Sequence, residues 1–187
     1  CLWPTPTSTV SHMLADQFGY HDLTMLNSDI FRLTQGSIKA PGHLYPQHPG
    51  YYGAPRTLTS YDWLSDHGAI LHQVATSCLL SGNEEYTARW MDSIISACEF
   101  IRDMSRIDTH PGIKGLLPPG VASDDGICTQ AVWNIAWNYK GLSTAVKLLK
   151  STGHPRYEEF DKLARDTKDI FCREYRVIVE NGPRWTD

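Results

Sequence analysis

Four aspartates form two close pairs that suit proton-transfer chemistry. Asp124 and Asp125 follow two prolines and a glycine, and Asp62 and Asp66 lie near the start of an earlier predicted helix. A carboxyl group donates a proton and a carboxylate accepts one, so two such groups facing one space can act as general acid and general base. If the two segments are neighbours, they predict a carboxylate site between them. The candidate catalytic residues are Asp124, Asp125, Asp62 and Asp66.

The same aspartates have a structural alternative. Asp is preferred at helix N-caps, where it accepts backbone N–H groups and the helix dipole stabilises its charge. Two adjacent acids, Asp124 and Asp125, exceed what one cap needs. A carboxylate stabilised in this way suits a base or a nucleophile better than a proton donor.

Aromatic and polar side chains near these acids are candidates for binding a substrate. Tyr51 and Tyr52 lie in a Pro- and Gly-rich stretch over 35–59, and a long loop of this kind is more often functional. Trp133 and Trp137 lie four apart on an apolar helix, for which the alternative is core packing. Flat aromatic faces pack against apolar ligand surfaces, and the polar members of the set donate hydrogen bonds. The candidate binding residues are Tyr51, Tyr52, Arg56, Trp63, His67, Trp133 and Trp137.

Composition and charge exclude several classes of protein. The chain has 187 residues, about one domain, and a net charge of −4 with no run of Lys or Arg, so no nucleic-acid partner is expected. No apolar stretch reaches the roughly 18 residues of a membrane span. The five cysteines and eight histidines lack the spacing of a metal site, and no nucleotide loop, haem motif or nucleophile elbow occurs. We therefore expect no metal and no cofactor.

Hydrophobic periodicity predicts an all-α fold in a single helical domain. The helices at 61–80 and 124–151 are apolar on more than one face, whereas those at 84–105 and 155–175 are apolar on one side only. We expect residues 177–179 to form a short strand or a docking segment. The complete set of predicted helices is 7–18, 22–34, 61–80, 84–105, 124–151 and 155–175.

A repeat relates the last two pairs of helices. Four residues recur with the same spacing, Gly82, Tyr86, Phe100 and Arg102 matching Gly153, Tyr157, Phe171 and Arg173. They fall at equivalent stop, packing and end positions. The repeat predicts helical hairpins, each with an inner and an outer helix.

Three segments resemble the six-hairpin glycosidases. The run GLLPPGVASDDG over 115–126 resembles the loop between hairpins in that superfamily, and WNxAWNYxGL over 133–142 resembles its inner helices. The run SYDWLxDxG over 60–68 resembles an earlier inner helix. The resemblance covers about residues 50–176, best over 115–175, and is a style of motif that does not select one glycosidase family.

This resemblance implies an (α/α)6 toroid whose inter-hairpin loops surround a carbohydrate-binding cup. Two carboxylates in such a cup act as acid and as base or nucleophile; a separation of about 5–5.5 Å gives retention, and about 6.5–9.5 Å gives inversion. The chain has room for about three hairpins rather than six. We therefore expect an incomplete toroid, with the rest of a longer chain as a partner.

The expected function is that of a glycoside hydrolase-like enzyme that acts on a carbohydrate through Asp acid/base chemistry. One alternative is a polysaccharide lyase or sugar epimerase on the same toroid, which would depend on Tyr, His and Arg. The other is a non-catalytic helical module that binds a glycan or a protein. An extracellular or periplasmic location is expected if the chain belongs to a longer glycan-degrading protein.

Overall fold

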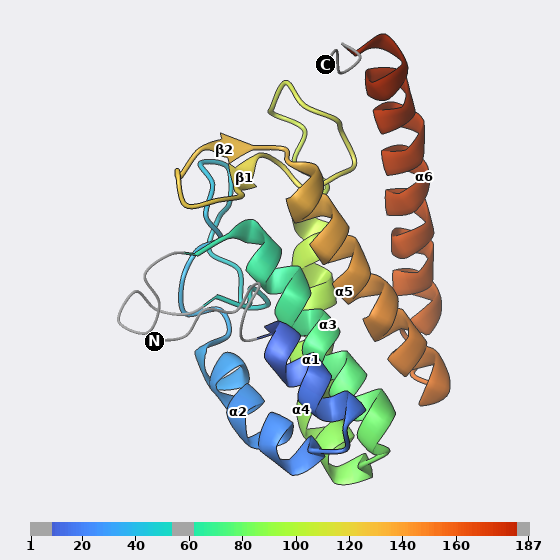
Figure 1. Cartoon of the computed structure of the whole chain (residues 1–187). Helices are drawn as coiled ribbons and strands as arrows, with labels where there is room; N and C mark the ends of the chain where they lie inside the picture. The colour runs from blue at the N-terminus through green and yellow to red at the C-terminus, as the bar shows by residue number, and fades with distance from the viewer. Residues whose placement is uncertain (1–8, 54–61, 183–187) are drawn as a thin grey trace, which may run out of the picture.

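The computed structural model describes residues 9–53 and 62–182 (Figure 1). The described residues form helices joined by loops and one very short hairpin, so the prediction of an all-α fold is confirmed. No helix in these two ranges is long and apolar enough to cross a membrane. The elements are α1 (Thr9–Gln17), α2 (His21–Thr34), α3 (Leu64–Ser81), α4 (Glu84–Met104), β1 (Gly120–Val121), β2 (Cys128–Thr129), α5 (Val132–Ser151) and α6 (Tyr157–Asn181).

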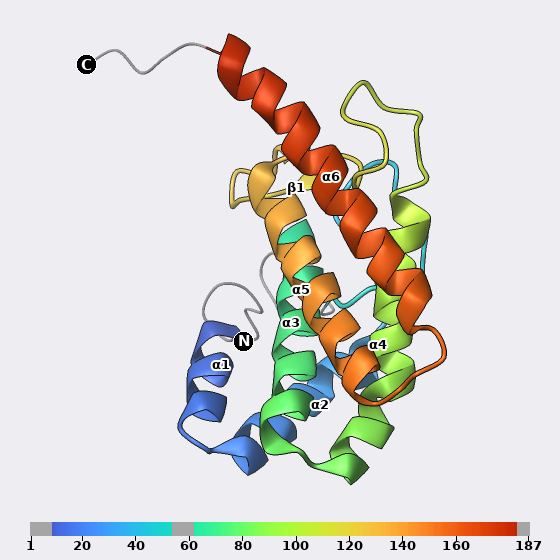
Figure 2. The same cartoon turned by 90° about the vertical axis from the view of Figure 1, so that its right-hand side faces the viewer.

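The helices pack as three consecutive hairpins in two layers. α3 lies between α1 and α5 in an inner layer, and α2, α4 and α6 form the outer layer (Figure 2). The burial of α3 and of α6 fits their layers, because α3 is buried on nearly all sides, whereas the buried residues of α6 are limited to Phe160, Ala164 and Thr167. This order of inner and outer helices is the one the repeat predicts. Closure into a six-hairpin toroid stays a prediction.

The connections differ at the two ends of the layers. The turns within hairpins, at 18–20, 82–83 and 152–156, are short and lie at one end, whereas the described parts of the connections between hairpins, 35–53 and 105–131, reach the other end (Figure 1). Gly82 (φ 59°) and Gly153 (φ 64°) take the same left-handed conformation at the ends of α3 and α5. This conformation favours glycine, so the two turns are structurally equivalent, as the repeat predicts.

Two glycines bring α3 and α5 into close contact. A Cβ on Gly68 would overlap the backbone of Trp137 and Asn138, and a Cβ on Gly141 would overlap the carbonyl oxygen of Gly68. The Asn138 amide then donates to the Leu64 carbonyl oxygen at 3.0 Å and ties the two helices together. The inner layer therefore depends on small residues at one crossing point.

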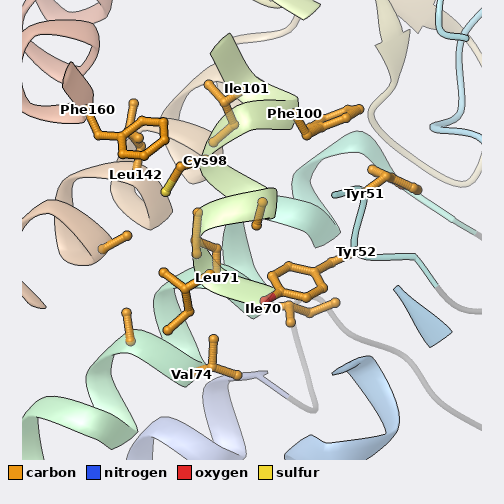
Figure 3. Packing of buried hydrophobic residues seen from close by; sticks show 14 of the residues in the cluster. Tyr51, Tyr52, Ile70, Leu71, Val74, Cys98, Phe100, Ile101, Leu142 and Phe160 are labelled. Atoms are coloured by element: carbon orange, nitrogen blue, oxygen red, sulfur yellow. The ribbon is translucent and has the colours of Figure 1, made fainter. Parts of the chain in front are cut away.

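The loop before α3 is part of the hydrophobic core. Tyr51 and Tyr52 expose none of their surface and lie beside Phe100 of α4 and Ile70 of α3 (Figure 3). The Gln35 side-chain amide holds the loop in place by donating to the carbonyl oxygens of Gly50 (3.0 Å) and Ser93 (2.9 Å).

Two element predictions are wrong. The helix predicted over 124–151 begins only at Val132, because residues 120–129 form a β-hairpin in which Gly120 pairs with Thr129 and Val121 with Cys128. Residues 177–179 are neither a strand nor a separate segment. They continue α6, since no helix-breaking residue occurs before Gly182.

Candidate functional site

The first turns of α3 and α5 meet at the end that carries the long connections. The Trp133 indole N–H donates to the Ser65 hydroxyl at 3.0 Å, which joins the two turns directly. The Asn134 side-chain amide donates to the carbonyl oxygens of Gly120 (3.2 Å) and Val121 (3.3 Å), so the base of the β-hairpin lies against the same turns. The helices that follow the two acidic segments are therefore neighbours, which is the condition under which the sequence predicts a shared carboxylate site.

Asp62 is half-buried just before α3 and has a fixed hydrogen-bond donor. The Tyr51 hydroxyl donates to its Oδ2 at 3.1 Å. Burial raises the pKa of Tyr51 well above its usual range, and the nearby carboxylates of Asp62 and Asp66 raise it further. The phenol therefore keeps its proton and holds the Asp62 carboxylate in one orientation.

The Asp66 carboxylate caps α3 and is not exposed on the surface. It is completely buried in the first turn of α3, and its Oδ2 accepts the Trp63 backbone N–H at 3.1 Å. A carboxylate at this position satisfies an N–H group that has no partner within the helix. Trp63 itself exposes only 9% of its surface. The capping interpretation thus fits Asp66, and Trp63 offers little surface to a ligand.

Asp124 and Asp125 do not stand at a helix start, which corrects their expected position. Both are exposed in the turn of the β-hairpin. The Asp125 Oδ1 accepts the Ser123 hydroxyl (2.7 Å) and the Ile127 backbone N–H (3.0 Å). These two hydrogen bonds, the backbone one first, lower the pKa of Asp125. Asp125 therefore stabilises its own turn and stays ionised.

Three predicted binding residues are enclosed in the core, which corrects their assignment. The His67 Nδ1 accepts the Tyr52 backbone N–H at 3.0 Å, and its Nε2–H donates to the Ala97 carbonyl oxygen at 3.1 Å. The Tyr52 hydroxyl is engaged with Ser93 at 2.8 Å, and Tyr51 stacks on His67 with ring centroids 5.6 Å apart. Burial lowers the pKa of His67 to about 3, so the ring is neutral. Tyr51, Tyr52 and His67 thus have no face left for a substrate.

Trp133 and Trp137 remain accessible, unlike the tyrosines. Trp133 exposes 43% of its surface although its N–H is bound, and the two indoles meet edge to face with centroids 5.7 Å apart. Trp137 is half-buried and lies 6.4 Å from the His72 ring of α3. Both indoles therefore lie along the junction of α3 and α5 rather than in the core. Arg56, the remaining candidate, lies outside the described residues.

Sequence reasoning missed two polar residues beside these indoles. The Lys140 ammonium lies over the Trp137 ring, 5.1 Å from its centroid. The His72 Nδ1 lies 2.8 Å from the Thr144 hydroxyl of α5. The signal for Lys140 was the stripe of Trp133, Trp137, Lys140 and Thr144, spaced four, three and four, which puts these residues on one face of α5. No such pattern indicated His72 of α3.

The described residues contain no cluster of three or more His, Cys, Asp or Glu side chains that could hold a metal ion. A pocket of about 710 Å³ lies between residues 111–114 and α6, and none of the four candidate aspartates lines it. Its charged lining residues are Lys114, Arg173 and Glu174, which do not form a carboxylate pair. The α3–α5 junction carries one oriented carboxylate and an accessible pair of indoles. It is therefore better suited than this pocket to binding a polar ligand with an apolar face.

Comparisons of the chain with models of protein families, with curated proteins and with solved structures find no match.

Proposed function

We propose that the end of the inner layer formed by the first turns of α3 and α5 binds a carbohydrate, and that the chain is glycoside hydrolase-like. The observation that carries this proposal is Trp133, an indole fixed by Ser65 yet 43% exposed. A rigid aromatic face binds the C–H face of a sugar ring without losing side-chain freedom, while the sugar hydroxyls stay available to polar groups. Trp137 extends the same face.

Asp62 is the carboxylate best suited to chemistry at this site. Glycoside hydrolysis needs one carboxyl group that protonates the leaving oxygen and one carboxylate that activates water or attacks the sugar carbon. Asp62 is half-buried and oriented by a protonated Tyr51, which fits the second role. Asp124, on the adjacent hairpin, is the remaining candidate for the first role, because Asp66 and Asp125 are held by backbone N–H groups.

A second candidate is a glycan-binding module without turnover. It is favoured by the exposure of Asp124 in a hairpin turn, since a proton donor at neutral pH normally needs burial to raise its pKa. A lyase or epimerase would need a histidine or tyrosine that titrates or transfers protons. The enclosed ring of His67 and the raised pKa values of the two buried tyrosines do not support that alternative.

Release of reducing sugar from a panel of polysaccharides tests this proposal. Asp62→Asn and Asp124→Asn should each lower hydrolysis at least about 100-fold, the scale of loss for a general acid or base. Asp92→Asn, on the exposed side of the outer helix α4, is the matched control and should leave it unchanged. Hydrolysis that survives the double variant would contradict the carboxylate assignment, and binding without hydrolysis would favour the module.

A further inference from the structure

Charge is divided unequally between the two helical layers. The chain carries a net charge of −4, yet α5 contains Lys140, Lys147 and Lys150 and no acidic residue. The only acid of α3 is Asp66, which is buried as a cap. The outer helices α4 and α6 carry acids along their length. The helices α3 and α5 are therefore more positive than the protein as a whole, and Asp62 and Asp124 of the proposed site lie in the segments that precede them.

Lys140 is the cation that geometry associates with the proposed sugar site. It follows Trp133 and Trp137 on the same face of α5, and its ammonium lies 5.1 Å from the Trp137 ring centroid. This cation–π contact holds the charge beside the indole pair. Lys140 and Lys147 take part in none of the ion pairs among the described residues.

His72, on the facing helix α3, is also affected by the positive charges of α5. Its ring lies between Trp137 and Thr144, and burial, followed by the charges of Lys140 and Lys147, lowers its pKa to about 4. The two lysines are thus close enough to α3 to act on a group held between the helices. A neutral His72 also leaves the lysines as the cations of this face at neutral pH.

We propose that the saccharide bound at the α3–α5 junction is anionic, with a sugar carboxylate facing the Lys140 ammonium while a sugar ring stacks on Trp133. This inference rests on the proposed function, and it names the substrate class of that site as uronate-containing glycans. A lysine is a compact charge that contacts one carboxylate through up to three N–H donors. Because Lys140 takes part in no ion pair in the part of the chain that the structure describes, it can make that contact with a ligand without breaking an internal ion pair.

Matched pairs of ligands test the proposal. Oligogalacturonate, oligoglucuronate and oligomannuronate are each titrated into the intact chain as the free acid and as the methyl ester, which removes the charge and keeps the sugar. The free acid of at least one backbone should bind about tenfold more tightly than its ester, the scale of one charge-assisted contact. Lys140→Gln should remove this difference. Its affinity for the ester should change less than twofold.

Lys150→Gln is the control for net charge. Lys150 lies on the same helix, but its ammonium is over Tyr157 of α6, 5.8 Å from that ring centroid, so the free acid should still be preferred. Equal binding of acid and ester, or binding of neutral sugars alone that needs Trp133, would overturn the anionic site and leave the proposed function standing. If no saccharide binds to the intact chain, or if binding survives Trp133→Ala, the proposed function fails as well.

Discussion

Single side chains at the α3–α5 junction differ mainly in what their polar atoms already bind. Asp62 is half-buried and accepts a hydrogen bond from the Tyr51 hydroxyl. Asp66, four residues later, is buried and accepts the Trp63 backbone N–H. Trp133 has its N–H satisfied and its face accessible. A ligand can therefore stack on the exposed face of Trp133 without displacing the hydrogen bond that fixes its indole.

The buried imidazole of His67 gives a prediction about pH. Its pKa is lowered from 6.5 to about 3 by burial, so the unfolded chain binds a proton between these values that the folded chain does not. Stability is then complete above pH 6.5 and falls as the pH drops toward 3. His67 alone should lower the free energy of unfolding by about 2 kcal/mol between pH 7.5 and pH 5. Half-buried His72, with a pKa lowered to about 4, adds in the same direction.

Urea unfolding at the two pH values measures this loss, and His67→Gln should reduce it. An NMR titration in which the His67 ring gains its proton near pH 6.5 would contradict the burial that the account assigns to it.

The candidate residues could be chosen from the sequence, but their solvent exposure could not be predicted from it. Residue type and spacing selected Asp62, Trp133 and Trp137 as candidates, and their roles stay predictions. Tyr51 and Tyr52 fell in a segment rich in proline and glycine, which normally lies on the surface. Their burial depends on Gln35 and Gly50 packing against α4, a long-range contact that no local pattern encodes.

At the scale of elements, the crossing of α3 and α5 positions both halves of the site. The close approach at Gly68 sets the distance between the turn that carries Ser65 and the turn that carries Trp133. Any side chain at this crossing must push the helices apart, because the atoms in its way are backbone.

Gly68→Ala should therefore destabilise the protein strongly. We expect a loss of about 3 kcal/mol in the free energy of unfolding, at the upper end of overpacking costs, although alanine is otherwise the better helix former. Gly126→Ala is the comparison, since that glycine has a positive φ of 71° but open space around it. It should cost about 1 kcal/mol through backbone strain alone. Thermal or urea unfolding of the two variants measures the difference, and equal losses would contradict the tight crossing.

Helix periodicity predicted the helices well, except over residues 120–129, where the chain forms a β-hairpin instead of a helix. The hairpin β1–β2 has only two residues in each strand, too few to show an alternating pattern. Its turn is set instead by Asp125 binding its own loop. The acids expected at a helix start consequently lie on a hairpin, eight residues or fewer before α5 begins at Val132.

At the scale of the whole molecule, the two ends of the helical layers differ in the connections they carry. The end with short turns, closed by Gly82 and Gly153, connects the helices of each hairpin. The other end gathers the described parts of the long connections, the β-hairpin and the first turns of α3 and α5 (Figure 1). The layered order was predictable from which helices are apolar all round. Which end would carry the site depends on loop packing and could only be inferred by resemblance.

The most direct test of the account is the NMR spectrum of the six tryptophan indole N–H groups during titration with the uronate oligosaccharides. If the proposed site is correct, the signals of Trp133 and Trp137 shift together, and their shifts level off at high saccharide concentration. The signal of Trp90, which is fully buried in α4, should stay in place and serves as the internal control. Shifts confined to other tryptophans, or no shift with any saccharide, would contradict a carbohydrate site at the junction of α3 and α5.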